Sequence, residues 1–172
     1  MSNWNILSEA EYNRAWDYIF DELKFNPSPY VAKKFDNLPS PNIWFDTASI
    51  FDGFFIQSDF DELYFVALNL LKQISKSKNI IALDWQHECF SFNPYLPFDR
   101  FENDTWGIPF LPDGDSTFFL TNDFSNGVFG DGINLQICFW GKELLDAFKE
   151  IKSSKILSNQ MTTFKKIPRL SS

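Results

Sequence analysis

The most chemically distinctive residues of this chain lie close together in the segment IALDWQHECFSF, residues 81–92. It contains the chain's single histidine, His87, three residues after Asp84 and two residues before Cys89. An aspartate could orient the imidazole, and a histidine could deprotonate a thiol for nucleophilic attack. Yet apolar residues surround Cys89 in sequence, and thiols in apolar surroundings are usually inert. We therefore expect no nucleophilic catalysis, and a structural His87 that is hydrogen-bonded near Asp84.

Metal and cofactor sites have characteristic spacings, and this chain lacks them. One histidine, without Cys-x-x-Cys or His-x-x-x-His, gives no zinc signature. The segment LPDGDS, residues 111–116, resembles only a fragment of a calcium loop and is better explained as a turn. FSNGVFGDG, residues 124–132, has neither the glycine spacing of a dinucleotide site nor a P-loop lysine. We expect no metal and no cofactor.

Hydropathy and charge patterns predict the elements that position these residues. Apolar residues at three- and four-residue spacing, with charges that suit the helix dipole, predict helices at 8–24, 59–76 and 141–152. Aromatic and β-branched runs predict strands at 43–50, 80–92 (two strands, or one with a bulge), 116–121 and 134–140. Residues 93–114 contain four prolines and are expected to form a loop. The glycine-rich residues 124–132 are expected to connect two strands.

These elements predict one α+β domain over residues 1–152 with a largely antiparallel sheet. A basic C-terminal tail, residues 153–172, is expected to lie free in solvent. No apolar run approaches the roughly 20 residues that span a bilayer, and the N-terminus does not resemble a secretory signal. Two cysteines, Cys89 and Cys138, are too few for a disulfide framework. A soluble, cytoplasmic protein with reduced thiols is expected, and its oligomeric state stays open.

The net charge of −8 is unevenly distributed along the chain. Residues 149–172 contain six basic residues and one acidic residue, a net of +5, which leaves −13 on residues 1–148. Such a body repels nucleic acid and attracts basic proteins or cations. Neither a nucleic acid nor a membrane is an expected partner.

Three blocks of sequence resemble a bacterial family of unknown function, domain of unknown function twenty-seven-sixteen. The blocks are ALDWQH (82–87), LPDGDSTFFLTNDFSNGVFG (111–130) and LQICFWGKELL (135–145), and the segments FNPSP and SPNIWFD also fit in order and spacing. The resemblance covers most of residues 12–148. The chain departs from it at Ser116 and Thr117, where the family often has aromatics, and at residues 131–133, where it often has His-Pro-Trp. The resemblance implies no known activity. If the family's second histidine serves one, this chain has lost it.

The acidic body suggests an immunity protein, one that binds and neutralises a bacterial toxin domain. Such toxins are often basic nucleases of contact-dependent growth inhibition and related systems, so an acidic surface would steer association and exposed aromatics would anchor it. Loop 93–114 is expected to contribute most. The predicted contact residues are Phe101, Glu102, Asp104, Trp106, Asp59, Asp61, Glu62, Asp113 and Asp115, with Asp123 and Asp131 as further acidic candidates.

The alternative function is small-molecule binding or hydrolysis in a pocket around Asp84, Trp85 and His87. There the indole could stack on a ligand while the aspartate and the histidine form hydrogen bonds with it. The turn at residues 111–115 is expected to border this pocket.

Overall fold

One antiparallel sheet organises the part of the chain that the structure describes. The computed structural model describes residues 2–51, 57–76, 78–96, 106–112, 114–153 and 165–166. Its strands are β1 (Trp4–Ile6), β2 (Asn42–Asp46), β3 (Ile80–Asp84), β4 (Phe90–Phe92), β5 (Ser116–Thr121), β6 (Gly127–Asp131), β7 (Gln136–Trp140) and β8 (Lys165–Lys166). They pair in the order β1-β4-β3-β5-β6-β7-β2-β8, and every described pair is antiparallel. The predicted α+β fold with a largely antiparallel sheet is confirmed.

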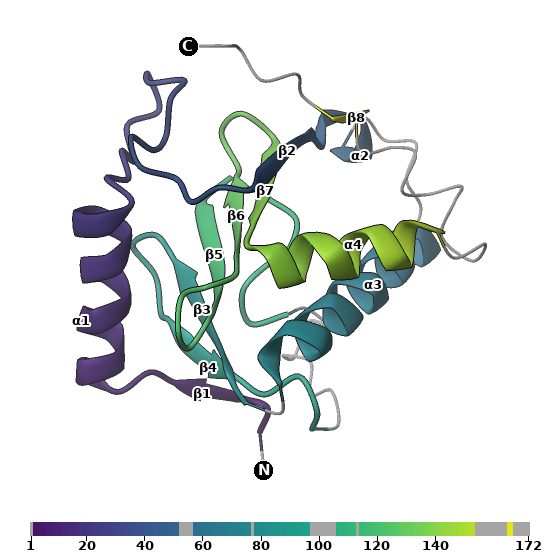
Figure 1. The fold of residues 1–172 in the computed structure, drawn as a ribbon, viewed down its shortest axis with the longest axis horizontal. Helices are drawn as coiled ribbons and strands as arrows, with labels where there is room; N and C mark the ends of the chain where they lie inside the picture. The colour runs from purple at the N-terminus through teal and green to yellow at the C-terminus, as the bar shows by residue number, and fades with distance from the viewer. Residues whose placement is uncertain are drawn as a thin grey trace.

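Helices cover both faces of this sheet, as Figure 1 shows. The helices are α1 (Glu9–Asp17), which continues as the π-helical turn η1 (Tyr18–Glu22), α2 (Ala48–Phe51), α3 (Gln57–Ser75) and α4 (Lys142–Ser153). Helices α3 and α4 lie on one face, and α1 lies on the other (Figure 1). Among the described residues, no helix has the length and hydrophobicity needed to cross a membrane.

Burial on both faces explains why the central strands are almost continuously apolar. Successive strand residues point to opposite faces, so the neighbours Phe118 and Phe119 enter two different cores. Phe119 packs with the α3 and α4 side, while Phe118 packs with Trp16 and Phe25 on the α1 side. Both phenylalanines are at most 1% exposed. A strand buried on both sides needs no polar face, which is the usual reason for such runs.

The first helix begins where the sequence predicts it. The Ser8 hydroxyl accepts a hydrogen bond from the Glu11 backbone N–H, and the Glu11 carboxylate accepts one from the Ser8 N–H. This capping box satisfies two N–H groups that the helix itself leaves unpaired. Together α1 and η1 run from Glu9 to Glu22, within the predicted span of 8–24.

The strand predicted at 43–50 is too long, because residues after Asp46 turn into a short helix. Strand β2 ends at Asp46, whose carboxylate accepts a hydrogen bond from the Ala48 N–H at 2.8 Å. The Thr47 hydroxyl donates to the Leu135 carbonyl at 2.7 Å. The Asp46–Ala48 hydrogen bond is local and turns the chain away from the ladder, while the N–H of Thr47 still bonds across to the same Leu135 carbonyl at 2.8 Å.

The glycine-rich segment 124–132 contains a full strand, β6, where the sequence predicts only a connection. Glycine serves packing here. A Cβ atom at Gly127 would lie 2.1 Å from the ring of Trp140, its partner on β7, and one at Gly130 would lie 2.7 Å from the Thr117 hydroxyl. Large neighbours take the space of the missing side chains, so these glycines are compatible with a buried strand.

Residues 106–112, the later part of the predicted loop 93–114, pack against the sheet. Trp106 was expected to be exposed, and this expectation is wrong. Trp106 is 8% exposed and contacts Trp4, Phe92 and Phe119 edge-on or tilted. Its burial follows from the apolar face of the sheet, because this segment packs in the same core as the strands and helices α3 and α4. Ile108, Phe110 and Leu111 join the same core.

Part of the basic tail belongs to the sheet. Lys165 and Lys166 form β8, which pairs with Asp46 and Phe45 at the outer edge of β2. The expectation of a tail free in solvent is therefore wrong for these two residues, because the unpaired backbone of an edge strand offers them hydrogen bonds. The rest of residues 154–172 lies outside the described part of the chain.

Candidate functional site

A tight turn at the end of β3 brings Asp84 and His87 together. The His87 backbone N–H donates to the Asp84 carbonyl at 3.3 Å, and Gln86 between them has a φ of +73°. A positive φ at the third position of a four-residue turn is the mark of a type II turn, which usually has glycine there. The kink predicted between Asp84 and His87 is present.

A second segment, far away in sequence, adds Asp115 to this pair. The Trp85 N–H donates to the Ser116 carbonyl at 3.0 Å, and the Gly132 N–H donates to the Asp115 carbonyl at 3.1 Å. A Cβ atom at Gly132 would lie 2.5 Å from the Gly114 backbone, so only glycine permits this approach. The backbone thus holds Asp115 against the turn after β3.

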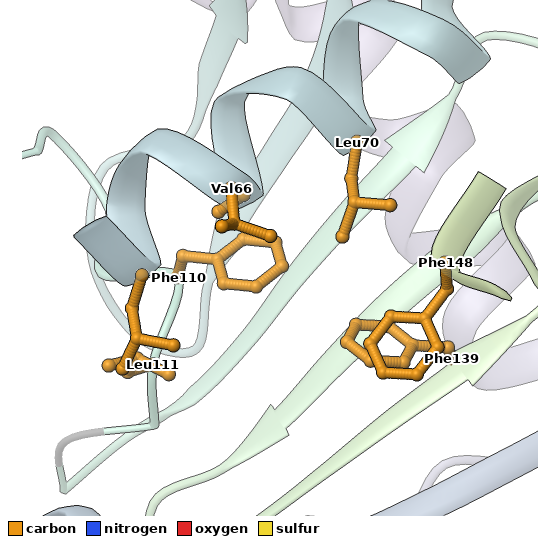
Figure 2. Close-up of a pocket in the computed structure, with 8 residues that line it drawn as sticks. Val66, Leu70, Phe110, Leu111, Phe139 and Phe148 are labelled. Atoms are coloured by element: carbon orange, nitrogen blue, oxygen red, sulfur yellow. The ribbon is translucent and has the colours of Figure 1, made fainter. Parts of the chain in front are cut away.

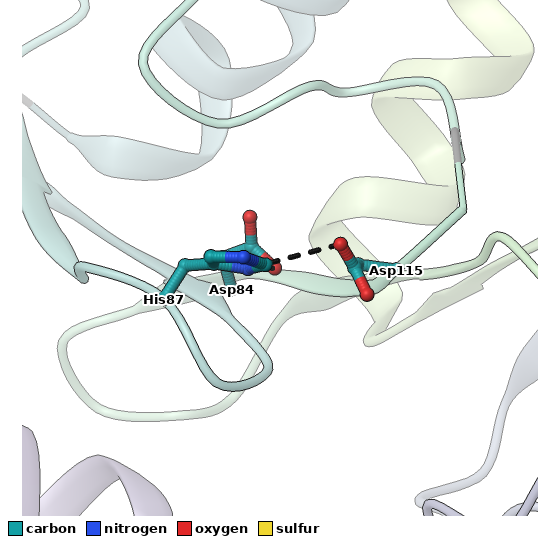
Figure 3. A group of neighbouring side chains, drawn as sticks. All are labelled: Asp84, His87 and Asp115. Carbon is teal, nitrogen blue, oxygen red and sulfur yellow. Dashed lines mark ion pairs between the residues drawn. The ribbon is translucent and has the colours of Figure 1, made fainter.

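The three side chains form a compact cluster that Figure 3 shows. His87 Nδ1 lies 3.3 Å from Asp84 Oδ1 and 3.7 Å from Asp115 Oδ2. The Asp84 side chain is only 15% exposed, whereas His87 is 59% and Asp115 52% exposed. One buried carboxylate therefore lies beneath two groups that solvent reaches.

Asp84 and His87 each shift the pKa of the other. Burial raises the pKa of Asp84, and the neighbouring His87 partly opposes that rise. The Asp84 carboxylate raises the pKa of His87, since it stabilises the imidazolium. Asp84 Oδ1 is buried, and apart from its 3.3 Å contact with His87 Nδ1 it has no hydrogen-bond partner. His87 lies beside Asp84, as the sequence predicts.

Cys89 does not take part in this cluster. Its thiol is buried and lies 3.7 Å from the carbonyl oxygens of Asp84 and His87. Burial raises the pKa of Cys89, and burial also raises that of Cys138 well above its usual value. Both cysteines are free, and such thiols stay protonated and unreactive near neutral pH.

Trp85 points away from the cluster into the α1 side of the core. Its ring meets those of Trp16 and Phe20 edge-on, with centroids 5.5 and 5.4 Å apart. Alternation along β3 explains this, because Trp85 follows Ile81 and Leu83 on one face while Asp84 lies on the other. The structure therefore brings Asp84 and His87 together but leaves the indole unavailable for stacking on a ligand beside them.

The described acidic residues of the predicted binding surface are scattered. Asp61 is exposed and Glu62 half-buried on α3, and Asp115 lies in the cluster above. Phe101, Glu102, Asp104 and Asp113 lie outside the described residues, as does the side chain of Asp59. Trp106, predicted as an exposed anchor of this surface, is in the core.

Asp131, a further predicted surface acid, is buried. Its carboxylate lies 4.0 Å from Lys34 Nζ with both side chains 1% exposed, and it accepts hydrogen bonds from Ile133 N and from Asn134. Lys34 Nζ also donates to the Ser28 carbonyl at 2.9 Å. Buried charges are tolerated when paired and hydrogen-bonded, so this pair fastens the segment before β2 to the β6–β7 turn.

A small cavity lies on the opposite side of the sheet from α1, between α3, α4 and β7 (Figure 2). Its volume is about 10 Å³, about the space of one water molecule. Only apolar side chains line it: Leu63, Val66, Ala67, Leu70, Phe110, Leu111, Phe139 and Phe148. It is a packing gap, too small and too apolar for a substrate.

Comparison with known proteins shows the family to which the chain belongs. Residues 6–145 match the family described as "Protein of unknown function (DUF2716)", and the chain belongs to that family. It is also 32% identical to the "Uncharacterized protein YxiI" of Bacillus subtilis (strain 168), over 152 residues that cover 86% of this chain and 93% of that protein. No solved structure shows significant similarity to the chain. The resemblance inferred from the sequence blocks is confirmed, and the structure shows that residues of two of those blocks, ALDWQH and LPDGDS, meet in the cluster of Asp84, His87 and Asp115.

Proposed function

We propose that the protein is a bacterial immunity protein, which binds and neutralises a cognate toxin domain in the cytoplasm. The observation that carries the proposal is the charge of −13 on residues 1–148, against a net of +5 in residues 149–172. A toxin nuclease needs a positive cleft to bind its polyanionic substrate, so an acidic surface can compete for that cleft. The protein would act as an antitoxin by occlusion, as in contact-dependent growth inhibition.

The outer face of α1 and η1 adds a candidate surface that the sequence alone did not single out. Four of its acidic side chains are exposed, and none belongs to an ion pair among the described residues: Glu9, Asp17, Asp21 and Glu22. The one basic residue of α1, Arg14, is engaged elsewhere, since it donates to the Asn122 carbonyl and lies over the Phe124 ring. Residues 9–22 contain five acidic residues and one basic residue, so α1 and η1 together are net negative.

An apolar anchor is available on the same helix. Tyr12 is 43% exposed and touches Trp16 with its edge, so part of its ring faces solvent. Aromatic side chains of this kind supply most of the affinity at protein interfaces, while charges mainly raise the association rate. Tyr12 replaces the buried Trp106 as the anchor in this proposal.

The test begins with the gene immediately upstream. A large secreted protein with a toxin domain at its C-terminus is expected there, and expression of that domain is expected to stop growth unless this protein is co-expressed.

With purified components, the rate at which the protein associates with the toxin domain should fall as ionic strength rises, because the Debye length shrinks below about 8 Å. Charge reversal by Asp17→Lys with Asp21→Lys is expected to slow association by about tenfold or more.

Glu143→Lys with Glu150→Lys on α4 is the control, since it changes the charge equally on the opposite face of the sheet (Figure 1). Because it also breaks the ion pair of Glu143 with Lys76, circular dichroism must first show that this variant is folded. The control should associate at nearly the wild-type rate. A toxin domain that is not neutralised, or that binds with salt-independent kinetics, would contradict the proposal. Equal slowing by both pairs would show that only net charge matters and would remove α1 as the contact face.

A second candidate function is ligand binding or hydrolysis at Asp84, His87 and Asp115, which the convergence of these side chains favours. An imidazole held by a carboxylate can act as a general base. Activity on generic ester and phosphodiester substrates, lost in His87→Ala but kept in Glu88→Gln, would support it. Inactivity of the wild-type protein across both substrate classes would count against it.

A further inference from the structure

We propose that Asp84, His87 and Asp115 form a binding site for a divalent transition-metal ion, with zinc as the best-matched ion. This inference does not depend on the immunity role. The sequence predicts no metal because no two ligands have a zinc-type spacing in the chain. The third ligand comes from a segment that only the fold brings near, 28 positions after His87.

The spacing of the ligand atoms fits a bound ion. One ligand atom from each side chain lies within 4.8 Å of the other two, and the two distances from Nδ1 are 3.3 and 3.7 Å. Ligands bonded to zinc at about 2.1 Å and at tetrahedral angles are about 3.4 Å apart. The two distances from Nδ1 therefore need to change by only a few tenths of an ångström, and rotation of the exposed Asp115 side chain can bring its carboxylate within reach of the same ion.

An independent feature of the site is the unsatisfied oxygen of Asp84. Asp84 Oδ1 is buried and has no well-aligned hydrogen bond, although burial of a carboxylate oxygen without one is costly. The same atom faces His87 Nδ1 at 3.3 Å. A cation between them would satisfy it, which neither the neutral imidazole nor the nearby backbone does.

The backbone around the site is preorganised. Asp84 lies in register with Thr117 at the end of the β3–β5 ladder, and the Trp85 N–H to Ser116 carbonyl hydrogen bond ties the two ligand segments together. A Cβ atom at Gly132 would meet the backbone beside Asp115, so the approach of that segment is fixed as well. Ligands held before the ion arrives lose little entropy when it binds.

The donor set indicates which ion and what coordination. One imidazole and two carboxylates suit zinc or manganese better than calcium or magnesium, which prefer oxygen ligands alone. The thiol of Cys89 is not a candidate fourth ligand, because it is buried and points to backbone carbonyls. His87 and Asp115 are more than half exposed, so water or a solvent-borne group would complete the coordination. Such a site is open, as catalytic zinc sites are.

The experiment is a zinc titration of the full-length protein, purified without a histidine tag and freed of metal with a chelator. Calorimetry is expected to show one zinc ion per chain, and zinc is expected to raise the melting temperature. His87→Ala and Asp115→Asn should each weaken zinc binding at least tenfold, because each removes one of three ligands. Glu88→Gln, an exposed acidic residue next to His87, is the matched control and should bind as the wild type does.

Far-UV circular dichroism without metal checks that each variant is folded, which the exposure of His87 and Asp115 leads us to expect. The proposal is overturned if the wild-type protein binds no zinc, or if His87→Ala and Asp115→Asn bind it as tightly as the wild type. Magnesium or calcium binding tighter than zinc, and insensitive to His87→Ala, would overturn the assignment to a transition metal. Failure of the zinc titration leaves the toxin-neutralisation assay untouched, so the two proposals can fail separately.

Discussion

His87 illustrates how one buried neighbour can decide the behaviour of an exposed side chain. Solvent reaches the imidazole, but the Asp84 carboxylate beneath it is mostly buried and lies 3.3 Å away. Interaction with an opposite charge favours the protonated imidazole, so the pKa of His87 is raised from its usual value of 6.5. The consequence is an ion pair that is present between the pKa of Asp84 and that of His87, and that is lost as the histidine deprotonates.

We expect the imidazole of the metal-free protein to titrate above pH 6.5, and Asp84→Asn to lower that pKa. Because the folded-state pKa of His87 is raised, the ion pair contributes its full stability below pH 6.5, as long as Asp84 stays ionised, and loses it as the pH rises through the folded-state pKa of His87. Proton NMR of the single histidine measures both values directly, with Glu88→Gln as the control. A wild-type pKa at or below 6.5, or one that Asp84→Asn leaves unchanged, would show that the contact is unimportant in solution.

A carboxylate also holds together a secondary-structure connection, the turn between β5 and β6. The Asp123 carboxylate accepts hydrogen bonds from the hydroxyls of Thr121 and Ser125, each at 2.7 Å, and from the Ser125 N–H at 3.1 Å. These hydrogen bonds lower the pKa of Asp123 to about 2. An aspartate that satisfies several turn donors is a common way to fix a hairpin connection.

We therefore expect Asp123→Ala to lower the free energy of unfolding by about 1–2 kcal/mol at pH 7. Because the folded-state pKa lies below the usual 3.8, the contribution is present above pH 3.8 and is lost as the pH falls towards about 2. Urea unfolding of wild type and variant at several pH values measures the difference. Asp36→Ala removes an exposed ion pair with Lys33 and should change stability by less than about 1 kcal/mol. An equal effect of the two substitutions would contradict the capping argument.

How much of the fold the sequence predicts depends on whether the pattern is local. The capping box at Ser8 and the apolar periodicity of α3 are local, and both predicted helices are present. Strand β6 was missed because glycine normally weakens strands, and the reason for glycine at position 127 is the ring of Trp140 on the next strand. Local propensity does not contain that contact, and only the sheet pairing reveals it.

The candidate site has the same limitation. The turn joining Asp84 and His87 could be expected from the sequence, since the two residues are three positions apart. Asp115 belongs to the turn at residues 111–115, which the sequence predicts at the border of this site, but the contact of its side chain with His87 depends on the β3–β5 register and on the close packing of Gly132. Likewise, Trp106 was expected in solvent because it lies in a proline-rich stretch, yet it packs against Trp4, Phe92 and Phe119 in the core. Tertiary burial overrides local composition at these positions.

At the scale of the whole molecule, the sheet joins two cores that share a single set of strands. The α1 side includes Trp16 and Phe118, and the α3–α4 side includes Trp106 and Phe119. Neighbouring strand residues alternate between them, so neither core can open without disturbing strands that the other needs. We expect the described body of the protein to unfold as one cooperative unit.

Phe118→Ala and Phe119→Ala test this coupling, because the two side chains are adjacent in sequence, nearly fully buried, and packed on opposite faces. Each substitution should lower the free energy of unfolding by about 3–5 kcal/mol, from lost apolar burial and the cavity left behind. For each variant, tryptophan fluorescence and far-UV circular dichroism should give coincident urea transitions, since tryptophans lie in both cores and helices cover both faces. If an alanine variant is too unstable to fold, the milder Phe→Leu change at the same position provides the comparison. A biphasic transition, with one helical layer lost while the opposite core persists, would show that the two faces fold independently and that the sheet does not couple them.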